Sequence, residues 1–254
     1  MRKWLRDALL MYERNIMLTL RSPIWVLVAL FQPICWLTLF APLLSRLSGV
    51  PGFPPGSGLT VFTPGMLMML GIYSSAFVGF GLIPELRAGI IERFRVTPVS
   101  RSAVLLGRSL RDLTVLSVQG GLLVGAASLM GLRADLRGMG AALLLVLLLG
   151  LLMSSLSYRL AIAIPREDAL AQVVQFLTLP LVLLSGVTLP LTLAPEWLQR
   201  AAWFNPFSHA VSAARALFLG DLGNREIVTA FVLFALLAPL AAWRAVVAFQ
   251  KSAA

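Results

Sequence analysis

Apolar residues along this chain gather in six long runs that short polar connections separate. A helix rises about 1.5 Å per residue, so about 20 apolar residues cross the hydrocarbon core of a bilayer. None of the runs has Lys, Arg, Asp or Glu in its interior. The pattern predicts an all-α integral membrane protein with six transmembrane helices. The runs are Ile24–Leu44, Val61–Ile83, Leu113–Leu132, Met139–Leu156, Ala169–Leu189 and Ile227–Trp243.

The composition and the placement of the charges support this class. The chain has 254 residues, of which 59% are hydrophobic and 13% charged, whereas a soluble domain is about 25% charged. The formal net charge is +10. Cations that bind nucleic acid cluster on one exposed face, but here they lie at the ends of apolar runs. We therefore expect membrane lipids, and no nucleic acid, as partners.

The distribution of Lys and Arg between the connections predicts the topology. When the connections are assigned alternately to two sides, 15 of these residues fall on the side of the N-terminus and 6 on the other. Connections rich in Lys and Arg stay in the cytoplasm. The sequence predicts a multi-pass protein of the plasma (inner) membrane with both termini cytoplasmic.

Two polar stretches predict helices that do not cross the bilayer. In residues 1–22, apolar side chains recur at helical spacing and the charged ones fall mainly on the opposite face, so an amphipathic helix at the membrane surface is expected. In residues 85–101, Leu86, Ile90 and Phe94 form an apolar stripe and Pro98 ends the helix. This stripe must pack against the chain's own spans or against a partner, and composition alone leaves both open.

The last outer segment, residues 190–226, differs from the other connections. It is semi-apolar and rich in aromatic residues, but Pro195 and Pro206 interrupt it. Such a segment neither crosses the bilayer nor dissolves in water. We expect a re-entrant or outer-leaflet helical hairpin before the last span, with its aromatic rings at headgroup level.

The sequence offers no catalytic machinery. Its only lysines, Lys3 and Lys251, lie near the ends, so the phosphate-binding pattern G-x-x-x-x-G-K-[ST] does not occur. If ATP drives this protein, a separate polypeptide binds it. The sole histidine, His209, has no base, acid or metal ligand at meaningful spacing, which disfavours a hydrolase or a metalloprotease. We expect no enzyme activity, no metal and no cofactor in this chain.

The remaining chemistry is binding. Methionines and aromatic residues with a few neutral amides suit a large, amphipathic ligand that is not strongly anionic, although plain helix packing is the alternative. The candidates are Met69, Tyr73, Phe77 and Phe80 in the second run, and Gln172, Gln175, Phe176 and Thr178 in the fifth.

Two stretches contain motifs that a known family also carries. Phe62–Leu113 contains G-I-I-E-R and T-P-V-S-R, and Leu189–Gly220 contains a proline-rich turn, an N-P step and a later arginine. The first stretch resembles the second span and first cytoplasmic loop of the type-2 ATP-binding-cassette exporter permeases, most closely the daunorubicin-resistance branch. The second stretch resembles the segment before that family's last span. The first motif is specific and the second moderately so.

The resemblance implies one permease domain, residues 1–254, that works with two copies of a separate ATPase subunit binding ATP and Mg. It implies a homodimeric or heterodimeric permease, and we expect a second identical copy. Residues 1–22 would be a connecting helix and 85–101 the coupling helix that docks into the ATPase. The expected coupling residues are Glu85, Leu86, Arg87, Gly89, Ile90, Glu92, Arg93, Phe94, Arg95, Thr97 and Pro98.

The resemblance also implies the transport reaction. An amphipathic drug or lipid-like molecule would leave the cell between the two protomers, along the first, second and fifth runs. Two alternatives stay open. The same architecture could export a glycolipid or polysaccharide, or the chain could be an ATP-independent facilitator. A lipid-metabolising enzyme comes last, for want of an acid–base pair.

Overall fold

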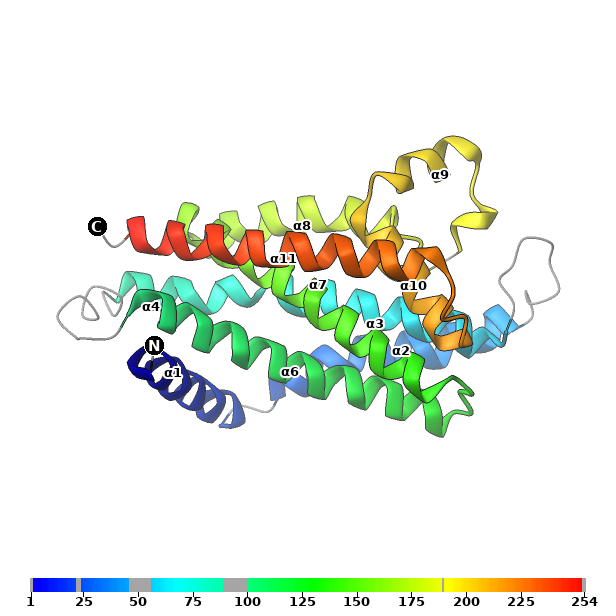
Figure 1. Ribbon diagram of the computed structural model, residues 1–254, viewed down its shortest axis with the longest axis horizontal. Helices are drawn as coiled ribbons and strands as arrows, with labels where there is room; N and C mark the ends of the chain where they lie inside the picture. Colours follow the sequence, from blue (N-terminus) through cyan, green and yellow to red (C-terminus); the bar gives the residue numbers. More distant parts are fainter. Residues whose placement is uncertain (1, 22–23, 46–55, 89–99, 189, 253–254) are drawn as a thin grey trace.

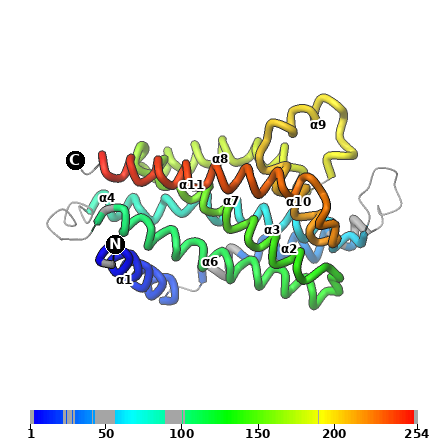
Figure 2. The backbone as a smooth tube through the Cα atoms, in the orientation of Figure 1, coloured from blue at the N-terminus to red at the C-terminus, as the bar shows by residue number. Residues whose placement is uncertain are grey.

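The chain folds into an elongated bundle of helices (Figures 1 and 2). The computed structural model describes residues 2–21, 24–45, 56–88, 100–188 and 190–252, and every regular element in these ranges is helical. The α-helices are α1 (Arg2–Leu20), α2 (Ile24–Ser45), α3 (Gly58–Ala76), α4 (Ile83–Arg87), α6 (Arg101–Leu129), α7 (Leu136–Ala163), α8 (Glu167–Leu183), α9 (Glu196–Trp203), α10 (Pro206–Leu219) and α11 (Arg225–Ser252).

Four of the six predicted spans are confirmed as helices long and apolar enough to cross a membrane. They are Gly58–Arg87, Ser102–Leu129, Leu136–Ala163 and Arg225–Lys251. The first predicted run falls on α2, whose described apolar stretch is Leu30–Phe40, and the fifth falls on α8, which has 17 residues. The all-helical class is therefore confirmed, while a total of six crossings stays a prediction.

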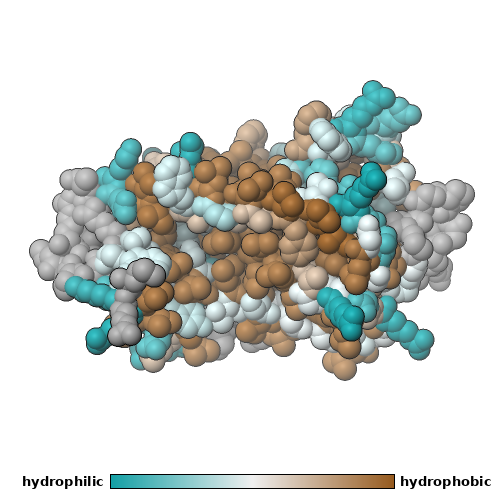
Figure 3. Space-filling view, viewed as in Figure 1, coloured by the Kyte–Doolittle hydropathy of each residue, from teal (hydrophilic) through white to brown (hydrophobic). Residues whose placement is uncertain are grey.

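The polarity of the surface fits a membrane protein. Hydrophobic side chains cover the middle of the face shown in Figure 3, and hydrophilic ones gather toward both ends. Helix α1 and the end of α11 lie at one end of the bundle, whereas α9 and the turn between α6 and α7 lie at the other (Figure 1). Both ends of the chain thus lie on the same side. That this side is cytoplasmic stays a prediction.

The N-terminal amphipathic helix predicted over residues 1–22 is present as α1. It packs along α6, where Trp4 Nε1 donates to Ser102 Oγ at 2.9 Å. The two helices approach so closely that a Cβ on Gly107 would lie 2.8 Å from the Ala8 carbonyl oxygen. The opposite side leaves several apolar residues exposed, as expected of a helix in the membrane interface. These include Leu9, Leu10, Met17 and Leu20.

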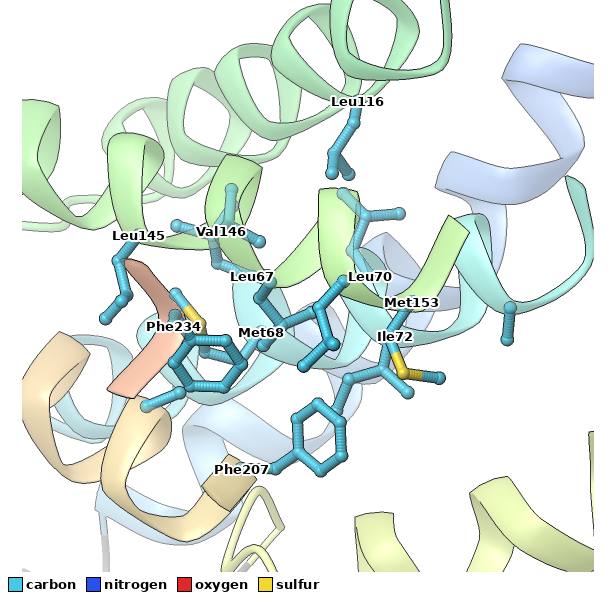
Figure 4. Packing of buried hydrophobic residues seen from close by; sticks show 14 of the residues in the cluster. Leu67, Met68, Leu70, Ile72, Leu116, Leu145, Val146, Met153, Phe207 and Phe234 are labelled. Carbon is cyan, nitrogen blue, oxygen red and sulfur yellow. The ribbon is translucent and has the colours of Figure 1, made fainter. Parts of the chain in front are cut away.

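Helix α3 is the centre of the bundle, and most of its residues are buried. Glycines allow its neighbours to approach. A Cβ on Gly71 would meet Val146 Cγ2 at 2.4 Å, and one on Gly65 would meet the Val187 carbonyl oxygen at 2.5 Å. Figure 4 shows buried side chains of α3 packed against those of its neighbours. Leu67, Met68, Leu70 and Ile72 belong to α3, Leu116 to α6, Leu145, Val146 and Met153 to α7, Phe207 to α10 and Phe234 to α11.

A buried arginine fastens the outer segment to this centre. Arg215, on α10, is only 9% exposed. Its Nε donates to the Val61 carbonyl at 3.1 Å, and its Nη2 donates to the carbonyls of Gly186 at 2.6 Å and Val187 at 3.3 Å. These carbonyls belong to α3 and to the turn after α8, so one guanidinium connects three parts of the chain. The predicted outer segment is helical over α9 and α10, and its entry into the membrane stays a prediction.

Candidate functional site

A cavity of about 430 Å³ lies between α2, α3 and α6. Helix α3 supplies Met69 and Tyr73, and its C-cap residue is Phe77; these are three of the residues predicted to contact substrate. Its wall is mostly apolar, and α1 reaches its edge with one side chain. The other lining residues are Thr19, Gln32, Pro33, Leu70, Ser74, Ser75, Val78, Arg111, Asp112, Val115 and Gln119.

The cavity has neutral polar groups along its length. Ser74 Oγ donates to Gln119 Oε1 at 2.9 Å, which joins α3 to α6. Gln119 is only 2% exposed, so its amide depends on protein or ligand partners for hydrogen bonds. A site of this kind can orient a molecule that is apolar over most of its surface and carries a few polar groups.

One end of the cavity is charged. The buried carboxylate of Asp112 accepts a hydrogen bond of 2.5 Å from the Tyr158 hydroxyl, which reaches across from α7. Arg111 Nε lies 3.1 Å from Asp112 Oδ1. This ion pair lacks the alignment of a hydrogen bond, and Oδ1 has no hydrogen-bond partner among the described residues. The carboxylate thus accepts a hydrogen bond through one oxygen, while the other oxygen is only ion-paired.

These charged groups correct one expectation from the sequence. The third apolar run begins at Leu113, so the sequence predicts that Arg108 and Asp112 lie in a polar connection before the span. Helix α6 instead begins at Arg101, and it buries Arg108 and Asp112 to 4% and 7% exposure. The apolar runs lack ionisable residues, but the interior of the folded bundle contains these two. A hydropathy pattern describes one segment at a time. It therefore does not predict that charged side chains pair with residues of neighbouring helices and are covered by them.

Helix α4 carries the described part of the predicted coupling segment. Pro84 lies in its first turn and Glu85 forms an ion pair with Arg108 of α6. Arg87 Nη2 donates to the Pro165 carbonyl, between α7 and α8, at 3.3 Å, and Leu86 is half-buried. The start of the segment is thus attached to both neighbouring parts of the bundle. The other predicted coupling residues, Gly89, Ile90, Glu92, Arg93, Phe94, Arg95, Thr97 and Pro98, lie outside the described residues.

The structure does not bring the predicted residues of the fifth run into this cavity. Gln172, Gln175 and Phe176 are exposed on α8. Thr178 is buried and lines a second cavity, between α7, α8 and α11. Phe80 is half-buried, with its ring centroid 5.6 Å from that of Phe77. Their participation in transport stays a prediction.

His209 has neighbours that its sequence position did not reveal. Its Nδ1 lies 2.8 Å from Glu226 Oε2 on α11, and its Nε2 lies 3.0 Å from the Trp203 carbonyl oxygen. The expectation that it lacks an acidic neighbour was therefore wrong. Both ring nitrogens are engaged in linking α10 to α9 and α11. Among the residues that the structure describes, no three His, Cys, Asp or Glu side chains gather as a metal site would require.

The long apolar helices define a multi-pass membrane protein, and the amphipathic cavity suits the binding of a ligand. The comparisons with known proteins identify its family. Residues 7–219 match the model of the ABC-2 type transporter family, and the chain belongs to that family. The resemblance inferred from G-I-I-E-R and T-P-V-S-R is confirmed.

Three relatives have sequences that are distantly similar to this chain. The chain is 24% identical over 216 residues to the daunorubicin resistance ABC transporter permease protein DrrB1 of Streptomyces coeruleorubidus, covering 84% of this chain and 75% of that one. It is 24% identical over 217 residues to a putative transport permease ycf38 of Cyanophora paradoxa, covering 85% and 75%. With the ycf38 protein of Pyropia yezoensis it shares 25% over 210 residues, covering 81% and 71%.

Membership of the family defines the chain as a permease subunit of an ABC-2 type transporter. The ABC-2 membrane domain lacks an ATPase domain, so the chain is not itself the enzyme of the transporter. It implies a partner subunit that hydrolyses ATP. The chain is accordingly a multi-pass membrane protein that works in transmembrane transport.

Proposed function

We propose that the chain is the membrane subunit of an exporter that moves an amphipathic drug or lipid-like molecule out of the cell. A separate ATPase subunit, which binds ATP and Mg, would drive it. The observation that carries this proposal is the cavity beside α3, with its wall of Met69, Tyr73 and Phe77. The name of the Streptomyces relative, a daunorubicin resistance permease, points to the same class of substrate.

The size and lining of the cavity support an amphipathic substrate. Its volume of about 430 Å³ lies within the range of about 300–1,000 Å³ found for drug-sized ligands. The rings and thioether would contact the apolar body of the molecule, while Gln119 and Asp112 would meet its polar groups. Methionine adapts to ligands of different shape, which suits an exporter of broad specificity.

We propose a second copy of the chain as the partner that completes the pathway. Helix α8 leaves Gln172, Gln175 and Phe176 on its exposed side, and α2 leaves Gln32 exposed. Amide side chains facing lipid lack hydrogen-bond partners, whereas amides in a helix–helix interface hydrogen-bond across it. A homodimer that buries these sides would place the first and fifth runs of both protomers along one path.

We propose residues 85–101 as the coupling helix and the side bearing the termini as cytoplasmic. The ion pair between Glu85 and Arg108 and the contact of Arg87 with Pro165 connect this segment to α6 and to the α7–α8 connection. A partner that pushes on the segment would therefore move both parts together. ATP-driven closure of the ATPase would then switch the spans between inward-open and outward-open arrangements.

Transport by the reconstituted complex tests this function. The permease and the ATPase subunit that co-purifies with it are placed in sealed liposomes, and ATP-dependent movement of fluorescent daunorubicin is measured. We expect Tyr73→Ala to lower transport several-fold, because it removes the largest polar-tipped side chain of the wall. Leu236→Ala, at an exposed position of α11, is the control and should transport normally.

The coupling step is tested by reversing the charges of Arg93 and Arg95. If substrate-stimulated ATP hydrolysis is unchanged, this segment is not the coupling element. Transport by the purified permease without nucleotide or ATPase would overturn the whole proposal and establish a passive facilitator instead.

A further inference from the structure

The second cavity has the form of a lipid-chain site. It measures about 460 Å³ and lies between α7, α8 and α11, with an almost entirely apolar wall. Leu156, Leu177 and Leu240 line it from these three helices, and Phe207 of α10 and Ala76 of α3 also line it. It lies apart from the substrate cavity, since the two share no lining residue.

Helix α8 closes this cavity only in part. Its buried residues form a single stripe at every fourth position: Leu170, Val174, Thr178 and Val182. Its other sides are open, with Phe176 77% exposed and Leu177 47% exposed. An acyl chain can therefore enter beside α8 from the surrounding bilayer, without displacing a packed helix.

Two arginines border the same cavity. Arg159 of α7 and Arg244 of α11 line it and are both exposed. No described carboxylate forms an ion pair with either one. Helices α7 and α11 pack side by side and run in the same direction, toward the end of the bundle where the chain termini lie (Figure 1). Both guanidinium groups thus lie near that end of their helices, where lipid headgroups meet the protein.

We propose that this cavity binds an anionic phospholipid, with an acyl chain between α7, α8 and α11 and the phosphate held by Arg159 and Arg244. The positive charge of the two arginines determines which class of lipid the site favours. Two unpaired cations at the border of an apolar slot favour a headgroup with net negative charge over a zwitterionic one. Arginine suits the phosphate because its planar donors can bind two oxygens at once. The lipid would fix the loosely packed α8 against α7 and α11.

Thermal unfolding of the purified full-length chain in a neutral detergent tests the site. The probes are dioleoylphosphatidylglycerol, dioleoylphosphatidylcholine and glycerol 3-phosphate, each titrated separately. We expect the phosphatidylglycerol to stabilise the protein saturably, and the other two to stabilise it far less. In the double variant Arg159→Gln/Arg244→Gln, we expect about a tenfold or greater rise in the half-saturating phosphatidylglycerol concentration.

Two further variants separate the lipid site from a general effect of charge. Arg133→Gln/Arg137→Gln removes two exposed arginines at the opposite end of α7 and should leave the response to phosphatidylglycerol unchanged. Ala241→Phe places a ring in the cavity and should weaken the response with both arginines present. Equal stabilisation by phosphatidylcholine, or an unchanged response of Arg159→Gln/Arg244→Gln, would overturn the proposal without affecting the transport function.

Discussion

The ion pair between Glu85 and Arg108 should be the most sensitive point of the coupling end. Arg108 is buried, with 4% of its side chain exposed, and Glu85 retains 19%. Glu85→Gln would leave the guanidinium buried and without its charge partner. The Nε of Arg108 already has no hydrogen-bond partner among the described residues, so this nitrogen does not offset the loss of the carboxylate.

The size of the effect follows from this burial. Removing one partner of a buried ion pair costs about 3–5 kcal/mol, because an uncompensated charge stays in the interior. The residual exposure of Glu85 places the expected loss at the lower limit, about 3 kcal/mol. In an Arg108→Gln background the same Glu85→Gln change should cost less than about 1 kcal/mol, so the coupling free energy, which is the difference between the two costs, should be at least about 2 kcal/mol.

A double-mutant cycle measures this value from the unfolding of the four variants in detergent. The matched control is the exposed pair of Glu196 and Arg200 on α9, whose side chains are 86% and 81% exposed. Exposed pairs of this spacing contribute about 0.5 kcal/mol or less. A coupling free energy for Glu85 and Arg108 no larger than that of the control pair would refute the argument that burial makes this contact strong.

Two further substitutions test the packing of the outer end. Arg215→Ala removes the donors to three backbone carbonyls and should lower stability by about 3 kcal/mol or more, whereas the exposed Arg200→Ala should leave the unfolding temperature nearly unchanged. Gly138→Ala places a Cβ 1.8 Å from the Leu217 carbonyl oxygen, so α7 and α10 must separate. Gly140→Ala, which meets nothing within 4 Å, should not destabilise, and equal unfolding temperatures of the two variants would contradict the close approach.

The sequence predicts the helices well because their signal is local. About 20 apolar residues in succession identify a span whatever its neighbours are, and four of the expected spans are present as long apolar helices. The helical pattern of residues 1–22 likewise predicts α1. The fifth run is less clear in the structure, because Pro180 lies within the last turn of α8 and the helix ends at Leu183.

The site is less predictable because it depends on which sides of the helices meet. Met69, Tyr73 and Phe77 recur at helical spacing and therefore share one side of α3, which made them reasonable candidates. Periodicity does not say that this side faces α2 and α6 rather than α8. The buried carboxylate of Asp112 was missed for the same reason, since its partner Tyr158 is 46 residues away in the sequence.

The charged residues of α6 connect α4, the described start of the proposed coupling segment, to the proposed substrate cavity. Arg108 and Asp112 are four residues apart, so they occupy adjacent turns on one side of the helix. Arg108 pairs with Glu85 of α4, and Asp112 accepts the hydrogen bond of Tyr158 on α7 while lining the cavity. Close packing transmits displacement rather than absorbing it. A movement imposed on α4 must therefore shift the turn of α6 that forms the charged end of the cavity, unless the ion pair breaks first. The same contact that stabilises this arrangement is thereby suited to link a push from the partner ATPase to the shape of the proposed substrate site.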